Sequence, residues 1–281
     1  MKKKLAFKEP MITPDNYILG AGNVIHTVQK EDGDWNDVLP QGERQNIRGI
    51  ESYDCTGFGT LNAIEALMKQ KFGVEENYSD RWVGIIAGTS AKTGGNDPHT
   101  VCEAIRKYGL IPESMLPFSD DLKDIDEYYS FKGSNITDCY KAGREWLARF
   151  EFKHEWVFQP SDPTDEKMNN IKTSLKFSPL GVAVDAWNMD NNGAYIRMGQ
   201  DNHWTMIYSL DDFIRVFDSY DPFKKNLVKN YGFKYCKVFS IEKRTTPLPK
   251  ENAYDFIKKS IDFLKDLVNA FIRRLGKYIN D

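Results

Sequence analysis

Residues 52–67 read SYDCTGFGTLNAIEAL, and this stretch decides the fold. Its apolar residues recur at three- and four-residue spacing and predict a helix over about residues 56–71, with one buried face. Cys55 stands just before this helix, so its sulfur would lie where unpaired N–H groups and the helix dipole favour a thiolate. A thiolate is a nucleophile, although a single cysteine beside a helix is more often a small buried apolar residue.

A thiolate nucleophile needs a base, and the chain holds four histidines, at 26, 99, 154 and 203. His203 opens the apolar stretch HWTMIYSL, which predicts a strand. Asp218 ends the next predicted strand, 213–218, and a strand–turn–strand hairpin would bring the two side chains together. A carboxylate in that place can orient an imidazole. This pairing makes His203 the first candidate for the base.

The remaining patterns predict an α+β fold, because helices dominate the first half of the chain and strands the second. Helices are expected at 98–108, where Gly109 is the stop signal, at 138–149 and at 164–176. Strands are expected at 24–28, 152–159, 180–187, 204–210, 213–218 and 235–241. Periodicity does not decide whether Trp82–Ala87 is a strand or a helix turn. After two prolines, residues 251–279 carry an amphipathic stripe that predicts a last helix.

Composition excludes several classes of protein. Of 281 residues, 41% are hydrophobic and 28% charged, which excludes a disordered or collagen-like chain. The net charge of −3 shows no excess of the positive charge that binds nucleic acid, so no nucleic-acid partner is expected. No apolar run reaches the roughly 18–20 residues of a membrane span, and the apolar stretch after the basic N-terminus is too short for a signal peptide. We therefore expect a cytoplasmic protein.

Four cysteines without a CxxC pair argue against a disulfide framework and against a zinc ribbon. Cys102, Cys139 and Cys236 are expected to be buried, reduced and inert. His99 and Cys102 have a spacing that suits one helix face, but no second pair completes a metal site. We expect neither a metal ion nor another cofactor.

Taken in order, Cys55 at a helix N-terminus, His203 opening a strand and Asp218 on the next strand resemble the papain-like cysteine peptidases. The resemblance covers roughly residues 38–241. It implies a papain-like α+β fold, in which a helical half carries the nucleophile, a sheet half carries the other two residues, and the active-site cleft lies between them.

Further motifs fit this resemblance. Gly94 and Gly95 resemble the family's glycine loop, which holds the substrate backbone in an extended pose. Residues 104–118, AIRKYGLIPESMLPF, resemble its helix, glycine and proline segment that ends on an aromatic residue. By the same resemblance, Trp204 and Tyr220 would shield the histidine–aspartate pair from water and line the substrate site.

The chain also departs from the family's pattern. The run around the nucleophile is SYDCT, which lacks the family's upstream cysteine and its tryptophan, and Asp218 replaces the more usual asparagine. The oxyanion glutamine is assigned to Gln45, ten residues upstream of the nucleophile, with Gln41 as second choice. About forty residues precede the core, fewer than a secreted papain's inhibitory propeptide, so the form resembles the bacterial or phage type.

The resemblance implies a mechanism for peptide or isopeptide bond cleavage. Cys55 would attack the acyl carbon to give a thioester. His203 would take the thiol proton and then donate it to the leaving amine, while Asp218 fixes the imidazole tautomer. Gln45 and the backbone N–H of Cys55 would stabilise the oxyanion. Two alternatives stay open: a peptidoglycan amidase or acyl transferase on the same triad, and an inactive papain-like domain used for binding or structure.

The predicted organisation is a hydrolase domain over 1–247, with a loop-rich lead-in at 1–40, followed by the amphipathic helix within 248–281. The expected partner is a peptide or protein substrate. A basic amphipathic helix can lie on a membrane surface, but the mixed charge over 251–279 favours packing or self-association. A component of a virion remains an alternative.

Overall fold

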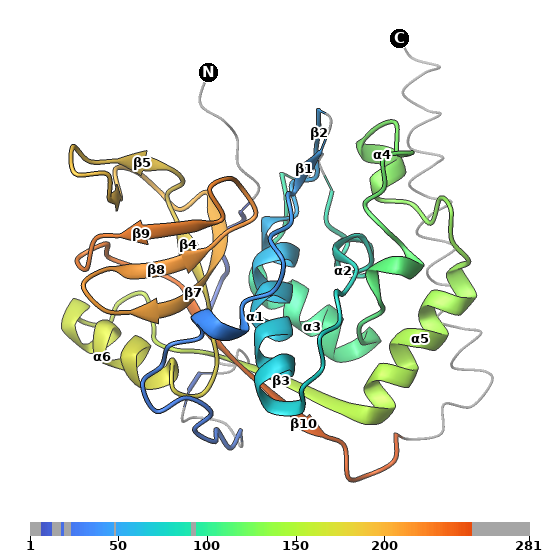
Figure 1. Ribbon diagram of the computed structural model, residues 1–281, viewed down its shortest axis with the longest axis horizontal. Helices are drawn as coiled ribbons and strands as arrows, with labels where there is room; N and C mark the ends of the chain where they lie inside the picture. Colours follow the sequence, from blue (N-terminus) through green and yellow to red (C-terminus); the bar gives the residue numbers. More distant parts are fainter. Residues whose placement is uncertain (1–6, 13–17, 20–23, 48, 91–93, 249–281) are drawn as a thin grey trace. The chain divides into compact units, whose positions relative to one another are not determined.

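The computed structural model describes residues 7–12, 18–19, 24–47, 49–90 and 94–248. The chain divides into two compact units, Met1–Arg244 and Thr245–Asp281, and nearly all of the second lies outside the described residues. The first unit has a helical part and a sheet part, with one helix between them (Figure 1). The α+β class expected from the sequence is therefore confirmed.

The helices are α1 (Cys55–Phe72), α2 (Asp80–Ala87), α3 (Pro98–Tyr108), α4 (Ile125–Tyr128), α5 (Ile136–Arg149) and α6 (Thr164–Ser174), with 3₁₀ turns η1 (Asn36–Val38) and η3 (Glu113–Met115). Helices α1, α3, α5 and α6 confirm the predicted segments to within a few residues. The ambiguous stretch at 82–87 is helical because Ser79 caps it: the Ser79 hydroxyl accepts a hydrogen bond from the backbone N–H of Trp82.

Eight strands form one sheet in the order β3-β10-β4-β7-β8-β9-β6-β5. Their bounds are β3 (Phe150–Trp156), β4 (Leu180–Val184), β5 (Asn188–Met189), β6 (Tyr195–Ile196), β7 (His203–Leu210), β8 (Ile214–Phe217), β9 (Lys224–Leu227) and β10 (Cys236–Lys243). Neighbours are antiparallel except for the β6–β9 pair. A separate two-stranded ribbon joins β1 (Asn46–Ile47) to β2 (Ile50–Glu51). The sequence did not predict β1, β2, β5, β6 or β9.

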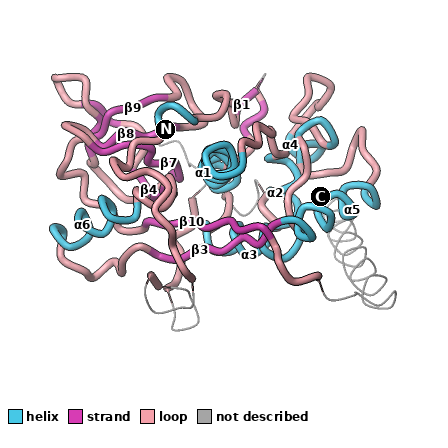
Figure 2. The backbone as a smooth tube through the Cα atoms, turned by 60° about the horizontal axis from the view of Figure 1, so that its bottom comes forward, coloured by secondary structure: helices cyan, strands magenta, loops and turns pink. Residues whose placement is uncertain are grey.

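Helix α1 packs directly on strand β7 and lies between the sheet and helices α2–α5, while α6 lies on the sheet side (Figure 2). The contact is close because two glycines face the indole of Trp204. A Cβ atom on Gly59 would lie 2.9 Å from that ring, and one on Gly181 would lie 2.4 Å from it. The ring is fully buried between them. This packing fixes the N-terminus of α1 against the start of β7.

The lead-in is irregular where it is described, and the predicted strand at 24–28 is wrong. Ile25 is 80% exposed and Val28 is 47% exposed, so the apolar residues there have no buried face to join. Further upstream, Phe7 forms a parallel bridge with Asn96 and stacks on Trp204 with ring centroids 6.1 Å apart. The lead-in thus bridges the glycine loop and the sheet.

The predicted tail helix at 251–279 lies outside the described residues. Among the parts of the chain that the structure describes, no helix is both long and apolar enough to cross a lipid bilayer.

Buried carboxyl groups gather in the helical part. Glu65 and Asp80 are largely enclosed, and burial raises the pKa of each. Burial also raises the pKa of Glu113 to about 8, although the backbone N–H of Phe118 donates to its Oε1 over 2.6 Å. A glutamate in an unfolded chain titrates near about 4.3. The folded protein therefore holds this proton more tightly than the unfolded chain does.

Stability is expected to fall as the pH rises from about 5 to about 8, because over this range the unfolded chain has released the Glu113 proton while the folded protein still holds it. Glu113→Gln keeps the acceptor for Phe118 and removes the titration, so it should flatten the decline, by up to about 1.4 kcal/mol per pH unit. Urea unfolding across this range measures the slope, with the exposed Glu166→Gln as control. Equal slopes in wild type and Glu113→Gln would contradict the assignment.

Candidate active site

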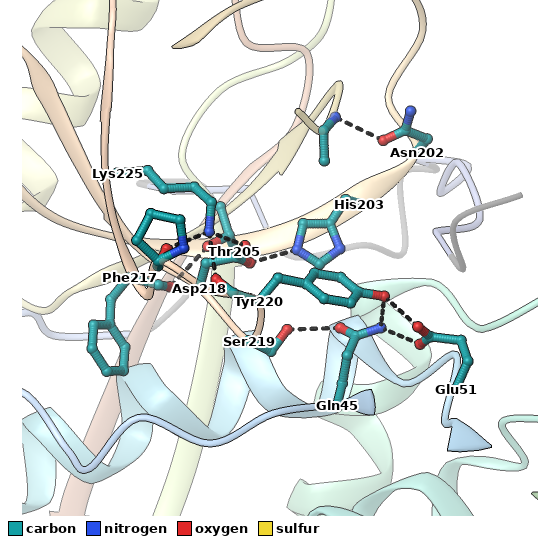
Figure 3. Close-up of polar contacts among 12 residues, drawn as sticks. Gln45, Glu51, Asn202, His203, Thr205, Phe217, Asp218, Ser219, Tyr220 and Lys225 are labelled. Carbon is teal, nitrogen blue, oxygen red and sulfur yellow. Dashed lines mark hydrogen bonds and ion pairs between the residues drawn. The ribbon is translucent and has the colours of Figure 1, made fainter. Parts of the chain in front are cut away.

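The structure brings His203 and Asp218 together. Strands β7 and β8 form an antiparallel pair, which places the start of β7 beside the turn after β8. The Nε2 nitrogen of His203 lies 2.5 Å from Oδ1 of Asp218, and both side chains are fully buried (Figure 3). The other ring nitrogen, Nδ1, is buried with no hydrogen-bond partner among the described residues. An Nε2–H that donates to the carboxylate leaves the Nδ1 lone pair available as a base.

Cys55 is the first residue of α1 and is fully buried. The backbone N–H of Trp204, the residue after His203, donates a hydrogen bond to its sulfur. Burial raises the pKa of the Cys55 thiol, and the charges of Asp54, Asp218 and Glu51 raise it further, while the Trp204 hydrogen bond lowers it. The thiol is therefore neutral at rest, and its nucleophilic form requires that a base take the proton.

Lys225 is part of the site, and the sequence reasoning missed it. Its Nζ lies 2.7 Å from Oδ2 of Asp218, on the side opposite His203 (Figure 3). Burial alone would raise the pKa of Asp218, but the charges and hydrogen bonds of His203 and Lys225 outweigh it and hold that pKa below its usual value. The sequence signal that could have found it is the alternation of β9, in which Lys225 lies on the same face of the strand as Leu227.

Gln45 is buried and lies at the centre of a second network (Figure 3). Its amide nitrogen donates over 2.7 Å both to Oε1 of Glu51 and to the Tyr220 hydroxyl, and its oxygen accepts from Ser219. The Tyr220 hydroxyl donates to the other Glu51 oxygen over 2.8 Å. Both amide hydrogens of Gln45 are thus in use, and an oxyanion would have to displace one of these partners. Gln41 is exposed.

Two aromatic rings flank the imidazole. The Tyr220 ring lies 5.3 Å from the His203 ring, and its shielding role stays a prediction. Trp204 does not take that role: its ring stacks on Phe7 in a buried cluster that also holds Cys55. The indole beside His203 is Trp187, with ring centroids 5.7 Å apart. Alternation along β7 places Trp204 on the face opposite His203, which argues against the predicted role. Trp187 could not be found from the sequence because the path of the loop before β7 was unknown.

Gly94 and Gly95 both have positive φ, 67° and 89°, a backbone form that glycine adopts without strain. Residues 91–93 of the same loop lie outside the described part.

The unusual Asp54 before the nucleophile is fully buried between two glycines, and burial raises its pKa well above the usual value. A Cβ on Gly57 would come within 2.8 Å of its carboxylate, and one on Gly84 within 2.5 Å. This space accommodates the departure from the family's sequence.

The other candidate histidines are engaged elsewhere. His26 lies 2.8 Å from Glu155, and His154 lies between Glu103 and Lys237 at 3.0 Å from each. The His99 ring packs edge-on against His154. Cys102, Cys139 and Cys236 are buried and free, as expected.

Comparison with known proteins supports the architecture. No family model and no curated protein matches the sequence. The proform of the ragweed pollen cysteine protease Amb a 11 is similar in structure with a TM-score of 0.50 and 13% identity, over 78% of this chain and 67% of that one. Digestive procathepsin L 3 of Tenebrio molitor has a TM-score of 0.50 and 15% identity, over 80% of this chain and 73% of that one. Digestive procathepsin L2 of the same insect has a TM-score of 0.52 and 15% identity, over 74% of this chain and 67% of that one. The chain has the papain-like cysteine protease fold.

Proposed function

We propose that this protein is a cysteine-dependent hydrolase that cleaves peptide or isopeptide bonds through Cys55, His203 and Asp218. The observation that carries the proposal is the state of His203. One ring nitrogen is held by a buried carboxylate, while the other is buried without a partner among the described residues. A buried nitrogen that forms no hydrogen bond costs about 1–3 kcal/mol, so its persistence supports a role in proton transfer.

The chemistry follows from these groups. Nδ1 of His203 takes the thiol proton of Cys55, and the sulfur attacks the carbonyl carbon of the substrate. The tetrahedral intermediate collapses to a thioester as the imidazolium donates its proton to the departing amine. Water then enters, His203 takes one of its protons, and the water oxygen attacks the thioester carbon. The C–S bond breaks, the acid product leaves, and the imidazolium returns its proton to the Cys55 sulfur. Asp218 holds the ring in one tautomer and stabilises its positive charge.

Covalent labelling tests the proposal before any substrate is known. Native protein is treated with a small thiol electrophile and followed by intact mass, in wild type, Cys55→Ala and His203→Ala. Cys102, Cys139 and Cys236 are also buried and free, and they act as internal controls. We expect one label, absent from Cys55→Ala and slowed about 10²-fold or more in His203→Ala, which is the lower range for general-base assistance.

Labelling no faster than at the other three cysteines, or unchanged in His203→Ala, would contradict a catalytic pair and favour the inactive binding domain. If the pair is reactive, peptides and cell-wall fragments are screened in parallel. Release of an amine from peptides alone would support the peptidase. Turnover of cell-wall fragments alone would favour the amidase alternative.

A further inference from the structure

Lys225 reaches the active site from strand β9, and each of its three N–H groups has a partner. Its Nζ donates to Oδ2 of Asp218 over 2.7 Å and to the backbone carbonyls of Tyr220 and Pro222 over 2.6 Å each. The residue is 2% exposed. Its Nζ also lies 4.9 Å from the ring of Trp187, which flanks His203. The amine therefore joins the triad carboxylate, the turn that follows it and the ring beside the imidazole.

Burial of such an amine carries a desolvation penalty of several kcal/mol, which is offset only if the ammonium group is paired and hydrogen-bonded. Neighbouring Lys224 shows that the fold does not need two inward lysines. It points the other way, with its amine 2.9 Å from Asn36 near the surface. A purely apolar side chain at 225 could fill the same space, so the charge itself requires an explanation.

We propose that Lys225 is a positioning residue of the active site, which fixes the Asp218 carboxylate as an anion against Nε2 of His203. The two carboxylate oxygens are divided between the two cations, Oδ1 facing the imidazole and Oδ2 facing the ammonium. The carboxylate cannot rotate away from His203 without breaking the Lys225 contact. Only the catalytic consequence of this arrangement rests on the proposed function.

Removal of the Lys225 charge has a predictable sign. A positive charge at hydrogen-bond distance lowers the pKa of a carboxyl by about 1–3 units, so its loss must raise that of Asp218. Two further titratable groups interact with this pair: Asp221 in the same turn with Lys225, and Tyr195 on β6 with Asp218. Neither residue is mutated in the variants below. Any nearby group that must lose its proton before reaction is affected in the same direction, because the same positive charge has been removed. The acidic limb of the reaction should therefore move to higher pH.

The test compares Lys225→Met and Lys225→Gln, which remove the charge, with Lys225→Arg, which keeps it, and with Lys224→Met as matched control. The first readout is ¹³C NMR titration of the side-chain carboxyls in aspartate-labelled protein, with Asp218 identified by the signal missing from Asp218→Asn. The second is the pH dependence of Cys55 labelling. We expect both neutral variants to raise the pKa of Asp218 by at least about one unit and to move the acidic limb likewise.

In Lys225→Arg and Lys224→Met we expect the pKa of Asp218 and the acidic limb of Cys55 labelling to stay as in the wild type, and this result would support the proposal. An unchanged titration of Asp218 in a folded neutral variant would overturn the proposal, whatever the labelling shows. If both neutral variants fail to fold while Lys225→Arg folds, Lys225 serves stability alone and the proposal is also overturned. A raised titration with labelling that does not depend on His203 would keep the positioning role and reject the hydrolase function.

Discussion

Asp218→Asn is expected to destabilise the protein by about 3–5 kcal/mol, because it leaves the buried ammonium of Lys225 without a charge partner. Asparagine fills the same space as aspartate, so the loss in the free energy of unfolding comes from the missing charge and not from a change in side-chain volume. An unpaired buried lysine is more easily accommodated as a neutral amine, and the penalty should shrink as the pH rises toward the ordinary lysine value near about 10.4. Denaturant unfolding at two pH values measures both effects.

Two further variants make the test of Asp218 specific. The double variant Asp218→Asn/Lys225→Met should recover much of the lost stability, since it removes both members of the pair, but it should not recover the rate of Cys55 labelling. The control is Asp221→Asn, three residues away, whose half-exposed carboxylate pairs with Arg44 at the surface. A loss as small as that of Asp221→Asn, well under about 1 kcal/mol for a surface pair, would show that Lys225 is not charged in the folded protein.

Gln45→Ala is expected to lower kcat about 10²–10³-fold on any substrate that the enzyme turns over, with a smaller effect on KM. The reason is that an oxyanion donor acts on charge that develops only in the transition state. Gln41→Ala is the matched control, because Gln41 is exposed and was the second choice for this role. The measurement is steady-state kinetics with a peptide found in the parallel screen.

The network around Gln45 adds a second readout. Its amide donates to Glu51 and Tyr220 at rest, so binding of an oxyanion must exchange one of these hydrogen bonds for another. Equal losses in Gln45→Ala and Gln41→Ala would contradict the assignment. A rise in KM with unchanged kcat for Gln45→Ala would instead place the side chain in ground-state binding.

Much of the fold and the pairing of His203 with Asp218 could be predicted from the sequence, because the relevant signals are local. The period of α1 places Cys55 at its first turn, and the apolar run after His203 followed by a turn places Asp218 opposite. Helix α2 was ambiguous because its apolar run is short, and only the Ser79 cap decides its form. The strand expected at 24–28 failed because apolar residues alone do not supply a pairing partner.

The residues missed at the site were missed for a different physical reason. The roles of Lys225, Glu51 and Trp187 depend on which way each side chain faces, and only Glu51 among them reaches its partner Tyr220 across a long stretch of chain. Lys224 and Lys225 are chemically identical neighbours, and only the register of β9 against β8 turns the second one inward. Charged residues are usually read as solvated, so a buried ammonium is hidden in the sequence until the strand is placed.

The wedge of Trp204 between Gly59 and Gly181 has a mechanical consequence. The indole leaves no slack between the helix that carries the sulfur and the strand that carries the imidazole, since each glycine lacks room even for a methyl group. Close-packed interiors do not stretch continuously, so α1 and β7 should move as one rigid block. Under the proposed function, a substrate could not gain access by separation of α1 from β7, and its passage would depend on movement of the segments around this block.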